Sequence, residues 1–84
     1  MEKKEEFIER EKLLMDLEYN LIQEFIKIRK GQNVTQQELA ESSFVIRQTI
    51  TRIENCLTSP QIKTMISLLE PLGYTLKIEP IDKN

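Results

Sequence analysis

VTQQELAESSFVIRQTITRIEN, residues 34–55, is the most informative segment of this 84-residue chain for its fold. Its beginning, residues 35–38, fits a capping box. In this motif the hydroxyl of Thr35 caps the amide of Glu38, and the Glu38 side chain returns to the backbone of Thr35. The pattern therefore predicts that a helix starts at Gln36.

The apolar residues that follow predict two short helices meeting at a tight corner. The first helix buries Leu39 and Ala40, and the small side chain of Ala40 lets the two helix axes approach closely. The second helix, over residues 46–55, buries Ile50 and Ile53. Proteins use this corner mainly to place its second helix in the major groove of DNA.

The opposite face of the second helix is polar in a way that suits DNA. Arginine reads guanine and glutamine reads adenine through paired hydrogen bonds, and threonine touches a thymine methyl or a phosphate. A glutamine at the start of the preceding helix is placed to bind phosphate. The alternative is that these are ordinary polar surface residues. The candidate DNA-binding residues are Gln36, Arg47, Gln48, Thr49, Thr51 and Arg52.

The charge distribution agrees with this interpretation better than the net charge does. The net charge of −2 argues against nucleic-acid binding. Residues 25–65, however, hold six bases and three acids (+3), whereas residues 1–24 hold four bases and eight acids (−4). The basic charge therefore lies where the corner lies.

The composition argues against an enzyme. The chain has no histidine, two distant glycines and one cysteine, Cys56, so it offers no proton shuttle, phosphate loop or metal-ligand cluster. We expect no catalytic residue, metal, cofactor or small-molecule substrate. The charged amino terminus and the lack of a long apolar run predict a cytoplasmic protein without a membrane partner.

The segment before the corner, residues 2–30, has apolar residues in steps of three and four and is predicted to be helical. Asn20 is a weak point where one long helix is expected to divide in two. The early part is either a solvated amphipathic helix or an arm that binds a partner. The candidate partner-binding residues are Phe7, Ile8, Leu13, Leu14 and Leu17.

The segment after the corner predicts a helix and then a strand. Ser59-Pro60 is expected to open the helix, which ends near Pro71. Its expected buried face is Ile62, Met65, Ile66 and Leu69. Beyond it, apolar residues alternate at Tyr74, Leu76 and Ile78, which predicts a strand. This strand lacks a partner in the chain, so it is expected to pair with a second copy or with another protein's sheet.

The residues TQQELAESSFVIRQTITRIEN resemble the helix-turn-helix domain of the Cro and lambda-repressor (XRE) superfamily, and the likeness extends to residues 27–30, 59–60 and 68–73. The resemblance implies an all-α, five-helix domain over residues 21–73, with a helical extension over residues 1–20 and a short strand over residues 74–80. It also implies a structural ion pair between Arg29 and Glu54.

The flanks LEYNLIQEFIKIRK (17–30) and LGYTLKIEPI (72–81) look like those of HigA-type antitoxins. This narrower resemblance implies a homodimer that binds operator DNA, represses its own operon and neutralises a RelE-like (HigB-like) messenger-RNA-cleaving toxin with its acidic arm. Two alternatives stay open: a free-standing phage-type or mobile-element-type regulator without a toxin, and a protein-interaction module whose corner no longer binds DNA.

Three residues depart from the family pattern. Phe44 stands at the turn where the family favours glycine, and a left-handed backbone there costs on the order of 1 kcal/mol. Ile46 replaces the usual serine or threonine cap, which loses about 1 kcal/mol more. Cys56 replaces the glycine that commonly follows IEN. These departures bear on the angle and the start of the second helix.

Overall fold

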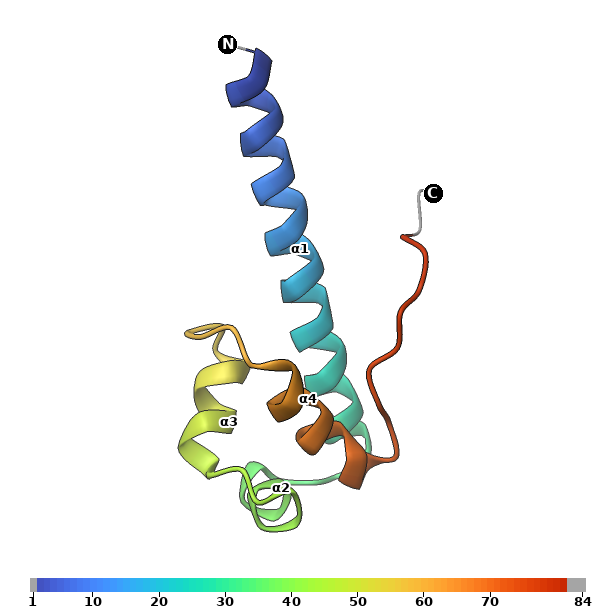
Figure 1. Ribbon diagram of the computed structural model, residues 1–84. Helices are drawn as coiled ribbons and strands as arrows, with labels where there is room; N and C mark the ends of the chain where they lie inside the picture. The colour runs from blue at the N-terminus through green and yellow to red at the C-terminus, as the bar shows by residue number, and fades with distance from the viewer. Residues whose placement is uncertain (1, 82–84) are drawn as a thin grey trace.

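The computed structural model describes residues 2–81 and is all-helical over that range (Figure 1). The all-α prediction is confirmed. The described residues form four α-helices and one 3₁₀ helix: α1 (Glu2–Gly31), α2 (Gln36–Ser43), α3 (Arg47–Glu54), α4 (Ile62–Leu69) and η1 (Glu70–Leu72).

The prediction of five helices is wrong for residues 2–81, and α1 is one reason. It continues through Asn20 without a break. Asparagine lowers helix stability by less than about 1 kcal/mol relative to alanine, and the leucines, isoleucines and glutamates around it favour the helix. The helix-favouring residues on both sides of Asn20 therefore outweigh its small cost. At the other end of the domain, the chain after α4 makes only the short η1 turn.

The predicted strand over residues 74–80 is also wrong, because residues 2–81 contain no strand. A strand is defined by hydrogen bonds to a neighbouring strand, and the described part of a single copy offers no such neighbour. The segment is nevertheless held at one point: Leu76 is half-buried against the core, whereas Tyr74 and Ile78 on either side are exposed.

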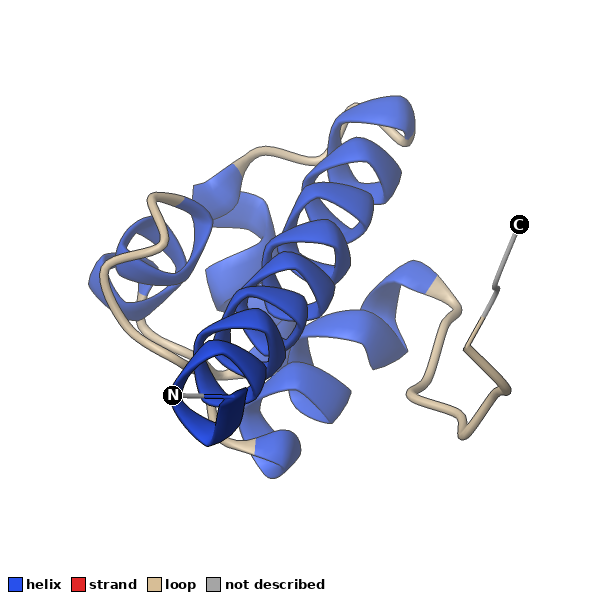
Figure 2. Cartoon of the chain, turned by 90° about the horizontal axis from the view of Figure 1, so that it is seen from above, coloured by secondary structure: helices blue, strands red, loops and turns tan. Residues whose placement is uncertain are grey.

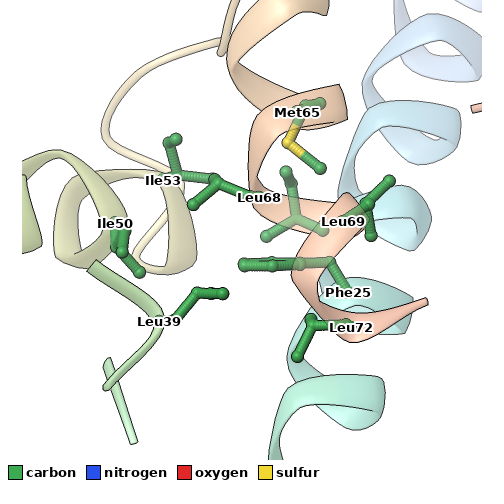
Figure 3. Close-up of a cluster of buried hydrophobic side chains, with 9 residues drawn as sticks. Phe25, Leu39, Ile50, Ile53, Met65, Leu68, Leu69 and Leu72 are labelled. Atoms are coloured by element: carbon green, nitrogen blue, oxygen red, sulfur yellow. The ribbon is translucent and has the colours of Figure 1, made fainter. Parts of the chain in front are cut away.

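One hydrophobic core joins all the helices (Figure 3). Only the end of α1 contributes to it, through Ile22 and Phe25. The remaining buried side chains come from α2, α3, α4 and η1 and are Leu39, Ile50, Ile53, Met65, Leu68, Leu69 and Leu72. The core thus holds the corner predicted between α2 and α3 against α1 and α4.

Helix α4 is rotated relative to its predicted orientation. It begins at Ile62, after an N-cap residue, Gln61, whose side chain makes no capping bond, so the predicted start at Pro60 is wrong. Met65 and Leu69 are buried as predicted, whereas Ile62 and Ile66 are exposed and Leu68 is buried in their place. Two apolar stripes of helical period run along this segment, and only the contacts with the other helices select between them.

The molecule consists of a compact head and a projecting helix (Figures 1 and 2). We call residues 22–72 the head and residues 3–21 the arm. The molecule measures 49 × 26 × 20 Å, and its long dimension reflects the 30-residue α1. None of the helices in residues 2–81 has a stretch long and apolar enough to cross a membrane. The large apolar side chains of the arm are exposed.

Candidate nucleic-acid interface

The amino terminus of α2 is fixed by the predicted capping box, which is confirmed. The amide of Glu38 donates to Thr35 Oγ1 over 3.0 Å, and the amide of Thr35 donates to Glu38 Oε1 over 2.9 Å. The bond from the Thr35 amide, followed by that from its side chain, holds the pKa of the Glu38 carboxyl below its ordinary value. Both bonds favour the charged form of Glu38.

The corner between α2 and α3 turns on a non-glycine residue in the left-handed region. Phe44 has φ 62° and ψ 21°, and its amide donates to the Ala40 carbonyl over 3.1 Å. Next to it, the buried Ser43 hydroxyl accepts a bond from the Val45 amide over 3.2 Å. The phenyl ring itself is 94% exposed, so burial does not offset the backbone strain.

The second helix of the corner, α3, starts without a side-chain cap. Its N-cap residue, Ile46, has an extended backbone (φ −62°, ψ 144°) and makes no side-chain capping bond. At the other end, Cys56 adopts φ 57°, and the Leu57 amide donates to the Arg52 carbonyl over 2.9 Å. The helix therefore occupies residues 47–54, one residue shorter at each end than predicted.

A buried ion pair ties α3 to α1. Arg29 donates from Nε to Glu54 Oε2 and from Nη2 to Glu54 Oε1, both over 2.7 Å. Its third bond, from Nη1 to the Val34 carbonyl, spans 2.8 Å. The side chains of the pair are each only 7% exposed. This two-bond pair is the one that the family resemblance implied, and it is directed into the protein rather than toward a ligand.

Gln36 extends this network to α2. Its Nε2 donates to Glu54 Oε1 over 2.9 Å, and its Oε1 accepts a bond from Thr51 Oγ1 over 2.9 Å. The sequence predicted contacts with DNA for Gln36 and Thr51 but not these bonds within the protein. A carboxamide nitrogen carries two hydrogens, so one N–H of Gln36 is not used by Glu54. Gln36 and Thr51 thus have a structural task in addition to any contact with DNA.

The outer face of α3 is polar and basic. Ile50 and Ile53 have no exposed surface, as predicted, and fix which side of the helix faces away from the core. On the other side the side chains of Arg47, Gln48 and Arg52 are exposed, whereas Thr49 and Thr51 are half-buried. In the part of the chain that the structure describes, neither Arg47 nor Arg52 forms an ion pair.

The remaining predicted site residues lie elsewhere. The five candidate partner-binding residues all lie on the arm and are exposed: Phe7, Ile8, Leu13, Leu14 and Leu17. Between α1 and the C-terminal segment lies a groove of about 340 Å³, lined by Leu21, Phe25, Tyr74 and Leu76 among others. No sequence pattern predicted this groove, because it depends on the path of the chain after Gly73.

Two comparisons with known proteins bear on this geometry. Residues 25–78, more than half of the chain, match the helix-turn-helix family. The chain is also similar to an uncharacterized HTH-type transcriptional regulator of Haemophilus influenzae: the two are 41% identical over 66 residues, which cover 79% of this chain and 67% of that protein. No solved structure matches the chain significantly. The match with the family spans the corner and the residues that hold it in place.

Proposed function

Because this chain belongs to the helix-turn-helix family of DNA-binding transcription regulators, we propose that it is a sequence-specific repressor that reads its operator with α3. The observation that carries the proposal is the two-sided character of α3. Ile50 and Ile53 are fully buried, while Arg47, Gln48 and Arg52 extend from the opposite side. A short helix held this way presents its polar side to the major groove.

Each residue of this face has a proposed role. Arg47 and Gln48, in the first turn of α3, read base edges, guanine and adenine respectively. Arg52, one turn further on, reads a base or binds a phosphate. Thr49 and Thr51 make close contacts beside them, and Gln36 gives its unused N–H to a phosphate. These assignments rest on exposure, on side-chain chemistry and on position in the corner.

The repressor is proposed to act as a homodimer. Two copies of α3 related by a two-fold axis would read half-sites about 34 Å apart in successive major grooves. The C-terminal segment is the proposed site of pairing, through Tyr74, Leu76 and Ile78. Its support is the 98% exposure of Ile78, an apolar side chain that is costly to leave in water.

The finer proposal is that this repressor is an antitoxin whose arm holds a RelE-like toxin. Two properties of the arm support it. Residues 3–21 hold six acids and four bases (−2), a net charge that attracts a basic partner, and the arm's large apolar side chains are 36–67% exposed. The alternative is a free-standing regulator without a toxin. The name of the Haemophilus influenzae relative, a transcriptional regulator, agrees equally well with either proposal.

The DNA-reading proposal is tested by fluorescence anisotropy with promoter DNA of the protein's own operon. Arg47→Ala and Arg52→Ala should each weaken binding by about 1–3 kcal/mol if they read bases, and should lower the salt slope if they bind phosphate. Lys63→Ala is the matched control, because Lys63 is an exposed base on α4 rather than α3. If both arginine variants bind like the control, the assignments are wrong.

If the chain binds no DNA even at low salt, the alternative of a protein-interaction module is favoured. At low salt even non-specific binding to DNA should be detected.

The antitoxin proposal is tested by co-purification with the product of the adjacent gene. Leu14→Asp together with Leu17→Asp should abolish capture of a small basic toxin and leave promoter binding unchanged, because both residues lie on the arm, away from α3. Retention of the toxin by this variant would show that the arm is not the binding site. If the wild-type chain captures no toxin, the free-standing regulator is favoured.

A further inference from the structure

Ile46 combines three properties that are unusual in one residue. It is the N-cap of α3, its side chain makes no capping bond, and that side chain is 67% exposed. Serine, threonine, asparagine or aspartate at this position would satisfy a free amide of the helix, whereas isoleucine leaves that amide to solvent. The side chain of Ile46 therefore contributes no hydrogen bond to the helix start.

Burial within the chain does not explain Ile46 either. Its neighbour Val45 is the residue of this turn that packs against the core. Ile46 immediately precedes Arg47 and Gln48, which are both exposed at the first turn of α3. The same end of the helix thus combines one branched apolar side chain with two long polar ones.

The chemistry of the major groove limits what such a side chain can contact. A phosphate or a polar base edge requires a hydrogen-bond donor or acceptor, and the isoleucine side chain has neither. The apolar group that a base offers in the major groove is the 5-methyl of thymine. The amino-terminal residues of a groove-reading helix are the ones that meet base edges.

We propose that Ile46 is a specificity-determining residue that contacts the 5-methyl group of a thymine next to the bases read by Arg47 and Gln48. This inference rests on the proposed DNA-reading function and deepens it, because it assigns one base of the operator by its methyl group. It also accounts for the missing cap, because an isoleucine that contacts DNA stands where a serine or threonine would have capped α3.

The experiment uses DNA in which thymine is replaced by uracil, which lacks only the methyl group. A duplex is first selected from a random-sequence library with the purified full-length chain. Each of its thymines is then replaced singly by deoxyuridine, and the affinity is measured for the wild type, Ile46→Ser and Ile46→Val. Ile62→Ser is the matched control, because Ile62 is an equally exposed isoleucine at the start of α4.

The wild type should lose roughly three- to fivefold in affinity at one thymine per half-site, the value expected when one methyl group is no longer buried. Ile46→Ser should show no loss at that thymine, Ile46→Val should retain most of it, and Ile62→Ser should behave like the wild type. Ile46→Ser should also have a raised midpoint of thermal unfolding, since serine can cap α3. That shift shows that the variant is folded.

Two results would overturn the inference, and they differ from each other. If a duplex is selected but the uracil penalties of the wild type and Ile46→Ser are the same at every thymine, Ile46 does not read the methyl group and the repressor proposal stands. If no duplex is enriched, the DNA-reading function fails and the inference fails with it.

Discussion

Arg29 holds the corner together through a single side chain. It bonds to Glu54 at the end of α3 and to the Val34 carbonyl just before α2, so three segments meet at one guanidinium group. Because the pair is almost completely buried, removing one partner leaves the other charged and unpaired in a poorly solvated place. The strength of this network is therefore best measured by truncating Arg29.

Arg29→Ala should lower the free energy of unfolding by about 3–5 kcal/mol, the usual cost of breaking a buried ion pair. Urea denaturation measures it. Lys30→Ala is the control, because Lys30 is the adjacent base on α1 and is exposed. Equal stability of the two variants would mean that the ion pair contributes no more than a surface charge.

Phe44 has a left-handed backbone whose strain is not offset by burial of its side chain. Phe44→Gly should raise the free energy of unfolding by about 1 kcal/mol, because glycine adopts the left-handed region without a steric penalty and the exposed ring gives up no burial. Urea denaturation is again the measurement. A destabilised variant would show that the ring makes a contact that matters in solution.

Glu38 should make the stability of α2 depend on pH. Because its folded pKa is lowered, its contribution is present above the unfolded pKa and is lost as the pH falls through the folded pKa. The difference in unfolding free energy between the wild type and Glu38→Ala should therefore shrink on acidification. Glu41→Ala, an exposed acid on the same helix outside the capping box, is the control and should show a smaller pH dependence.

Among the helices, α1 has two parts that differ in burial. Its last turns belong to the core, while the arm gives its apolar residues to solvent. Helical period alone predicted both parts, since it is the same along the whole segment. Which turns are buried depends on where α3, α4 and η1 dock.

Phe25→Ala should lower the free energy of unfolding by about 3–5 kcal/mol, because the ring is fully enclosed in the core. Leu14→Ser and Leu17→Ser should each change it by less than about 0.5 kcal/mol, since both residues lie on the arm and are exposed. Chemical denaturation of the three variants separates the two halves of α1. An arm substitution as costly as the Phe25 change would indicate burial of the arm in a dimer.

At the scale of the whole molecule, charge and shape are separated along one axis. The acidic arm projects at one end, and the basic stretch over residues 25–65 includes the corner in the head. DNA should therefore approach the head, and a basic partner the arm. The net charge of −2 averages these two regions and hides both.

The features that depend on short-range interactions could be predicted from the sequence. The capping box, the bounds of α2 and α3 to within a residue, the burial of Ile50 and Ile53 and the exposure of Arg47, Gln48 and Arg52 all follow from residues a few positions apart. Turn chemistry and helical period act within that distance.

The remaining features could not be predicted, because they arise from the packing of the helices. The rotation of α4, the bonds of Gln36 to Glu54 and Thr51, and the extended segment after Gly73 depend on contacts between residues far apart in the chain. The sequence around α4 fits two buried faces of the same helical period, and the Gln36 side chain can bond to several partners. Neighbouring residues alone do not distinguish between these possibilities. The packing of the core selects one of them, because only one buries the most apolar surface while satisfying the buried polar groups.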